Sequence, residues 1–192
     1  MFGAIATGTS LPAWDWRAIH PLIVHFPIVL FLVAPLFVLA AMFMRPERGR
    51  PYLLAALALM LLGTVTAFLA VVTGQAAARV ADPSTAAAVL IQQHEHFARI
   101  TRDIFAILTL IFATILFLPH LLRRELSGAA QRAILVAFLP LYVAGAVVLV
   151  DTGQAGGRLV HEFGVHARMV PAAQPLSQPP PPVLAKKANG TH

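Results

Sequence analysis

The chain has 192 residues, of which 58% are hydrophobic and only 11% are charged, with a formal net charge of +6. Soluble domains carry about 25% charged residues, so the composition indicates an integral membrane protein. Much of the positive charge lies in short loops, where it reports membrane topology rather than binding to nucleic acid. The absence of cysteine excludes disulfides, Fe–S clusters and covalently attached c-type haem.

Four apolar runs are long enough to cross a bilayer, which takes roughly 20 residues. They cover residues 21–43, 52–73, 100–119 and 133–151. The third helix is expected to begin earlier, in water, because Asp82 or Ser84 can cap it and Pro83 suits a first turn. The N-terminal stretch lacks the basic segment of a signal peptide, so the first run is expected to stay in place as a span.

Two Arg-rich loops predict the orientation. RPERGR joins the first two runs and HLLRRELSGAAQR joins the last two, and short basic loops face the cytoplasm. Both termini and the 74–97 loop are then expected on the outer face, the periplasmic side of a bacterial inner membrane. The predicted organisation is an outer N-terminal segment (1–19), a transmembrane domain (20–168) and a Pro-rich outer tail (169–192), which is either disordered or docks a partner.

A short motif recurs after the second and fourth runs. TGQAAARV (73–80) and TGQAGGRLV (152–160) share Thr, Gly, Gln, Ala and Arg in register. The two copies run in the same membrane direction, which predicts two helical hairpins related by a pseudo-twofold axis along the membrane normal. The alternative is coincidence in an Ala/Gly-rich chain. The predicted fold is therefore an all-α integral membrane protein, a four-helix transmembrane bundle built from two repeated helical hairpins.

Most of the histidines fall at or beyond the outer boundary of the predicted bundle. Ionisable groups at membrane depth are costly and usually functional, so a site is expected at this end. Pro27 frees the carbonyl of Ile23, and a kink there could aim His25 into the bundle. The alternative for His25 is a hydrogen bond to a neighbouring helix carbonyl or to a glutamine. The outer histidines are His20, His25, His94, His96, His161 and His166.

Three chemistries fit this outer end. The first is b-type haem, with His25 and either His94 or His96 as axial ligands and with arginines holding the propionates. Counted along the helices, His25 lies deeper than His94, whereas His20 matches His94 in height, so the pairing stays open. The second is zinc or copper near the membrane surface, with His94, Glu95, His96, His161 and His166 as possible ligands and His25 as a further metal candidate. The third is a hydrogen-bonded network without a cofactor. Further candidates for the haem site are His161, Arg79 and Arg158.

Small residues line one face of the second run. Their commonest meaning is close packing between helices. The other interpretation is a flat slot for a haem macrocycle or a quinone ring, for which Gly63 and Gly74 are the candidates.

The stretches HPLIVHFPIVL, HEHFA and GGRLVHEFGV resemble a family of bacterial four-helix membrane proteins whose domain has no assigned function. The resemblance covers residues 19–166. Its opening motif HPxxVHFP is the most specific part, and in this sequence His161 stands where the family pattern leads us to expect Tyr. The resemblance implies an association with redox proteins such as c-type cytochromes. The family positions fall on His20, His25, Pro27, His94, Gly156, Gly157 and Gly164.

The sequence predicts an electron-transfer subunit rather than an enzyme in its own right. It would bind b-type haem and link an outer-face redox partner, such as a c-type cytochrome or a dehydrogenase, to the quinone pool of the membrane. One alternative is a cofactor-free membrane anchor or assembly subunit of a larger complex. The other is an outer-face protein that binds zinc or copper.

Overall fold

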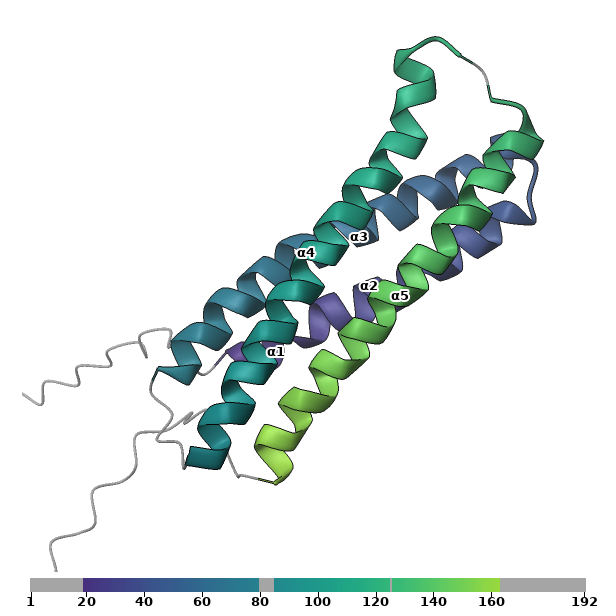
Figure 1. The fold of residues 1–192 in the computed structure, drawn as a ribbon. Coiled ribbons are helices and arrows are strands. Elements are labelled where there is room, and N and C mark those ends of the chain that lie inside the picture. Colours follow the sequence, from purple (N-terminus) through teal and green to yellow (C-terminus); the bar gives the residue numbers. More distant parts are fainter. Residues whose placement is uncertain (1–18, 80–84, 125, 163–192) are drawn as a thin grey trace, which may run out of the picture.

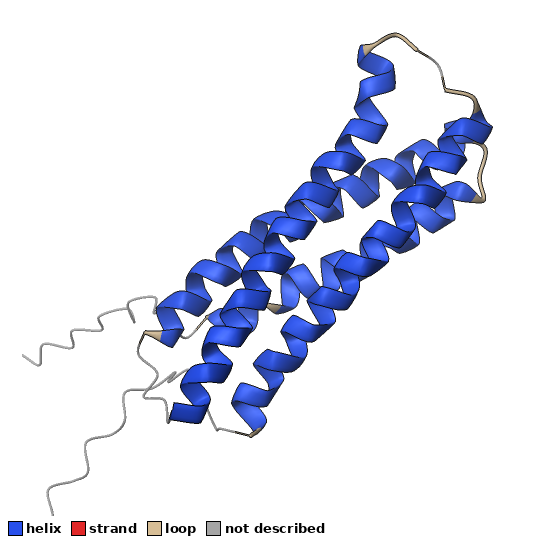
Figure 2. Cartoon of the chain, viewed as in Figure 1, coloured by secondary structure: helices blue, strands red, loops and turns tan. Residues whose placement is uncertain are grey.

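The computed structural model describes residues 19–79, 85–124 and 126–162. Within these ranges the chain forms helices and connecting loops, without strands (Figure 2). The elements are α1 His20–Ile23, α2 His25–Met42, α3 Pro46–Ala78, α4 Thr85–Leu121 and α5 Gly128–His161. The predicted all-α class is confirmed. The N-terminal segment and the Pro-rich tail lie outside the described residues, apart from Ile19.

Four stretches are long and apolar enough to cross a membrane: His20–Met42, Pro46–Ala78, Ala87–Leu121 and Gly128–His161. The predicted four spans are therefore confirmed. α3 and α5 continue past the expected ends, and the third span begins earlier than its apolar run, at Thr85, as expected. Its predicted capping residues, Asp82 and Ser84, lie outside the described residues. In α3 and α4 the added turns include the Ala-rich segments 76–78 and 86–88, which stay helical without being buried in lipid. The added turns of α5 carry three glycines, but Thr152, Ala155 and Leu159 are buried there, so packing against its neighbours stabilises them.

α1 and α2 follow one another with only Val24 between them. Val24 keeps helical dihedral angles, φ −61° and ψ −25°. Pro27 has no N–H to donate to the carbonyl of Ile23, so a helical hydrogen bond is missing at this point. The break between α1 and α2 thus results from the missing hydrogen bond, and the backbone remains helical at Val24.

The long helices pack as a ring (Figure 1). α2 packs most extensively on α3, and α4 on α5, while α3 also contacts α4 and α2 also contacts α5. α1 lies against α3. In such a ring α2 and α4 stand diagonally across the bundle.

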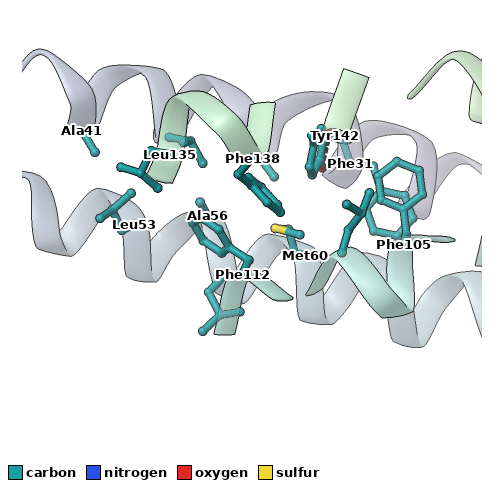
Figure 3. Packing of buried hydrophobic residues seen from close by; sticks show 14 of the residues in the cluster. Phe31, Ala41, Leu53, Ala56, Met60, Phe105, Phe112, Leu135, Phe138 and Tyr142 are labelled. Atoms are coloured by element: carbon teal, nitrogen blue, oxygen red, sulfur yellow. Dashed lines mark hydrogen bonds between the residues drawn. The ribbon is translucent and has the colours of Figure 1, made fainter. Parts of the chain in front are cut away.

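An aromatic cluster fills the middle of the bundle (Figure 3). The rings of Phe31 and Phe105 stack with centroids 3.8 Å apart, and Tyr142 meets Phe105 edge-on at 5.4 Å. The Tyr142 hydroxyl donates a hydrogen bond of 2.7 Å to the carbonyl of Phe31. That carbonyl needs an outside donor because Pro35, four residues on, has no N–H. The packed core leaves no polar route through the inner part of the described bundle.

Gly63 lets α2 approach α3 at this cluster. A Cβ atom built on Gly63 would lie 2.6 Å from Cε1 of Phe31, so only glycine admits the ring. The ring of Phe31 fills the space in front of Gly63. This space is therefore not open to a haem macrocycle or a quinone ring, which was one interpretation of the small residues on this face.

Candidate functional site

The charged residues mark where the hydrocarbon layer ends. On α4 no charged residue occurs between Asp103 and Arg123, and on α5 none occurs between Arg132 and Asp151. At 1.5 Å per residue these intervals span about 28–30 Å, close to the roughly 30 Å of a bilayer core. His94 precedes Asp103 by nine residues, or about 13 Å along the helix. The end of the bundle that carries His94, named the outer end after its predicted orientation, therefore stands at the level of the lipid head groups or above it.

His20 is held on α3. Its Nδ1 lies 3.1 Å from Oγ1 of Thr73, and the Thr73 hydroxyl donates to the carbonyls of Leu69 and Ala70. Since the hydroxyl proton is already used, Nδ1 must be the donor to Thr73, and Nε2 keeps its lone pair. The Ala70 carbonyl also lies near the ring. The imidazole lies on Gly74, where an added Cβ would come within 2.9 Å of Cε1.

His94 is held on α5 in a similar way. Its Nδ1 lies 3.1 Å from the backbone carbonyl of Thr152, which can only accept, so Nδ1 again carries the proton. The ring lies on Gly156, where an added Cβ would also come within 2.9 Å of Cε1. The Thr152 hydroxyl pairs with that of Thr101 at 2.7 Å and fixes the local geometry of α4 on α5.

The two imidazoles, called the histidine pair below, lie at the same end of the bundle. His20 of α1 lies on Gly74 of α3, and the next residue of α3, Gln75, bonds Glu95, the neighbour of His94 on α4. The hydrogen bonds of the two rings to Thr73 and Thr152 are both made by Nδ1, which leaves Nε2 as the other ring nitrogen of each. The arrangement thus offers two nitrogen lone pairs, each on a ring held by its Nδ1–H and by contact with a glycine.

The other predicted histidines lie elsewhere. His25 is exposed, and its Nδ1 contacts the carbonyl of Pro21 at 2.6 Å, one turn back on its own helix stretch. His96 and His161 are exposed as well. In the described ranges no three His, Asp or Glu side chains gather into a group that could hold a metal ion, so His25, His94 and His96 are not brought together. His166 lies outside the described residues.

An open depression lies between the outer ends of α3 and α4. It has a volume of about 330 Å³ and is lined by Gln75, Ala78, Arg79 and Glu95. Nε2 of Gln75 donates to Oε1 of Glu95 at 2.9 Å, and Nη2 of Arg99 lies 3.6 Å from the same oxygen. Arg79 has no acidic partner among the described residues.

The second predicted arginine is placed differently. Arg158 is exposed and bonds both carboxylate oxygens of Glu162, one turn later, at 2.9 and 3.1 Å. Those hydrogen bonds hold the pKa of Glu162 below its ordinary value. The two recurring arginines therefore have different surroundings, one beside a depression and one in an ion pair.

Comparison with known proteins gives a family but no characterised relative. A family model described as "Predicted membrane protein (DUF2231)" matches residues 17–169. The chain belongs to this family. The family resemblance inferred from the sequence is confirmed. Searches of curated proteins and of solved structures found no match.

Sequence reasoning in this DUF2231 chain missed how the two histidines are held. Thr73 and Thr152 serve as their hydrogen-bond partners, and Gly156 receives the ring of His94. The signal that could have found them is the recurring TGQ motif, since both threonines and Gly74 belong to it.

Proposed function

We propose that the chain is a membrane-embedded electron-transfer subunit that binds b-type haem, with His20 and His94 as axial ligands. The observation that carries the proposal is the similar hydrogen bonding of the two imidazole rings. Each imidazole donates its Nδ1–H to an oxygen of the protein and keeps Nε2 free. A histidine that ligates a metal usually has its second ring nitrogen bonded in this way, because that bond fixes the tautomer and the ring orientation.

The residues present fit such a group. The two neutral imidazoles would hold the iron, and Gly74 and Gly156 let both rings come close to the helices behind them. When bound, the haem supplies reversible one-electron chemistry. The chain's own part is to fix both ligands, and the aromatic core below keeps the site at the outer end of the bundle.

The proposed setting follows from the charge pattern. The Arg-rich loops favour a cytoplasmic inner end, and the histidine pair is then on the periplasmic face of a bacterial inner membrane. The proposed first partner is a redox protein on that face, such as a c-type cytochrome or a dehydrogenase. The membrane quinone pool is the proposed second partner. Arg79 and Arg158 lie at this end, but the proposal rests on the two histidines.

A cofactor-free anchor or assembly subunit is the second candidate. It is favoured by one observation, that both histidines already have a protein partner and so tie α1 to α3 and α4 to α5 without any ligand. A zinc or copper site is less favoured, because the pair supplies two ligands where a zinc site uses three or four from the protein.

The test is the haem content of the full-length protein, purified in mild detergent after expression with added haem precursor. The proposal predicts about one b-type haem per chain in a pyridine haemochrome assay. Protein that is fully folded, binds no haem and still supports assembly of its complex would overturn the proposal and establish the anchor.

A further inference from the structure

The depression between α3 and α4 has the features of a ligand site beside the histidine pair. Glu95 directly follows His94, and its carboxylate is close enough to act electrostatically on that imidazole. The depression has a volume of about 330 Å³ and is open to the surface, so a ring placed in it stays partly exposed.

Only some polar atoms of the depression have a hydrogen-bond partner among the described residues. Both contacts to Glu95 go to Oε1, so Oε2 has no partner in the described part of the chain, and neither does the guanidinium of Arg79 on the opposite wall. The depression thus presents one strong acceptor and one strong donor, a pattern that suits a neutral ligand with a hydroxyl group and a second oxygen. The negative charge of Glu95 disfavours a phosphate in the same place.

An apolar stripe leads from the membrane interior to this depression. Residues spaced three and four apart share one face of a helix, and Gln75 and Arg79 end such a row on α3. The members below them are large, apolar and exposed, and the guanidinium of Arg102 lies 4.9 Å from the ring centroid of Phe68, near the edge of the hydrocarbon layer. These members are Leu61, Val65, Phe68 and Val72. A ligand with a polar ring and a long apolar tail could lie along this face with its ring in the depression.

We infer that the depression binds the head group of a membrane quinol. Oε2 of Glu95 accepts a hydrogen bond from one quinol hydroxyl, Arg79 donates to the other oxygen, and the tail follows the exposed stripe of α3. The inference rests on the proposed electron-transfer function, since it places a reduced electron carrier next to His94.

The test is a calorimetric titration of the full-length protein in lipid nanodiscs, without oxygen and with dithionite present, using decylubiquinol as the ligand. A parallel titration without dithionite uses the oxidised form, decylubiquinone. The quinol should bind more tightly than the quinone, which has no hydroxyl to donate. Glu95→Gln should raise the Kd of the quinol roughly tenfold to hundredfold and should leave that of the quinone nearly unchanged.

Glu95→Gln is expected to fold, because the new amide oxygen can still accept from Gln75. The matched control is Glu162→Gln, which changes another outer carboxylate and should leave both Kd values unchanged. Arg79→Gln should weaken binding of both forms. The inference is overturned if Glu95→Gln leaves the Kd of the quinol unchanged. It is also overturned if anionic lipid displaces the quinol from the unaltered protein and binds more tightly to the Glu95→Gln variant.

Haem content measured on the same samples separates the two proposals. Haem-replete protein without Glu95-dependent quinol binding overturns this inference alone. Glu95-dependent binding to haem-free protein supports the quinol site and overturns the proposed haem function.

Discussion

Replacing Gly156 by alanine tests the close contact between His94 and α5. The new Cβ would lie 2.9 Å from Cε1 of His94, 3.4 Å from Nδ1 and 3.5 Å from Nε2. Carbon atoms in favourable contact lie about 3.5–4.0 Å apart, so the ring must retreat by roughly 0.6–1.1 Å. That movement strains its 3.1 Å hydrogen bond to Thr152, and overpacking of this kind costs about 1–3 kcal/mol.

The effect has to be separated from the helix propensity of alanine, which by itself stabilises a helix by up to about 1 kcal/mol relative to glycine. Gly153 and Gly157 supply the controls, because an added Cβ at either position meets nothing within 4 Å. Gly153→Ala should stabilise the protein by about 0.5–1 kcal/mol. The free energy of unfolding of Gly156→Ala should then fall about 1–3 kcal/mol below that of the control.

The assay is unfolding by titration with sodium dodecyl sulfate in mixed micelles, followed by circular dichroism. Gly74→Ala tests the same contact at His20 and should also be less stable than the two controls. Equal stabilities for Gly156→Ala and Gly153→Ala would refute the packing of His94 on α5. If the proposed haem binds, Gly156→Ala should also lower the haem content, whereas Gly153→Ala should not.

Three further changes give defined outcomes. Tyr142→Phe leaves the buried carbonyl of Phe31 without a donor and should cost about 1–3 kcal/mol in the same unfolding assay. Gly63→Ala pushes a methyl group to within 2.6 Å of Phe31, whose ring is backed by a stacked neighbour, and should also destabilise by about 1–3 kcal/mol. Thr73→Val keeps the side-chain shape but removes the acceptor of the His20 Nδ1–H, so, if the proposed haem binds, a redox titration should show a higher midpoint potential than that of the unaltered protein.

The spans could be predicted from the sequence because the bilayer sets their length. Uninterrupted apolar runs of about 20 residues are rare outside membrane-spanning segments, and all four runs proved to be helices. The outer extensions were missed in part because head groups and water impose no such length. Beyond the hydrocarbon, α3 and α4 continue through Ala-rich stretches by propensity and α5 continues through packing, and both give a weaker signal in the sequence.

Helical periodicity alone did not establish which of the histidines face a neighbouring helix. His20 and His25 are five residues apart, about 140° around a helix, so one of them can face α3 while the other points away. The sequence favoured His25 because Pro27 could redirect it, although helix depth already matched His20 with His94. In the structure Pro27 leaves the backbone helical at Val24, and His25 turns back to the carbonyl of Pro21. Which face of a helix meets its neighbour depends on packing at contacts such as His20 on Gly74, and a single sequence does not encode this locally.

The hairpin repeat stays a prediction, with one supporting correspondence. Each hairpin holds a histidine through a threonine of its TGQ motif and seats the ring on a glycine. The details differ, since Thr73 uses its hydroxyl and Thr152 its backbone carbonyl. If one hairpin was duplicated and the two copies later diverged, the corresponding threonines would still hold the histidines but would do so through different atoms.

The most direct test of the account is the reduced-minus-oxidised absorption spectrum of the purified full-length protein and of four single variants. His20→Ala and His94→Ala should each abolish or greatly reduce the b-type α-band. His25→Ala and His96→Ala, which remove exposed imidazoles at the same end of the bundle, should leave it intact. A spectrum without an α-band in the unaltered protein, or a band that depends on His25 rather than His20, would contradict the account.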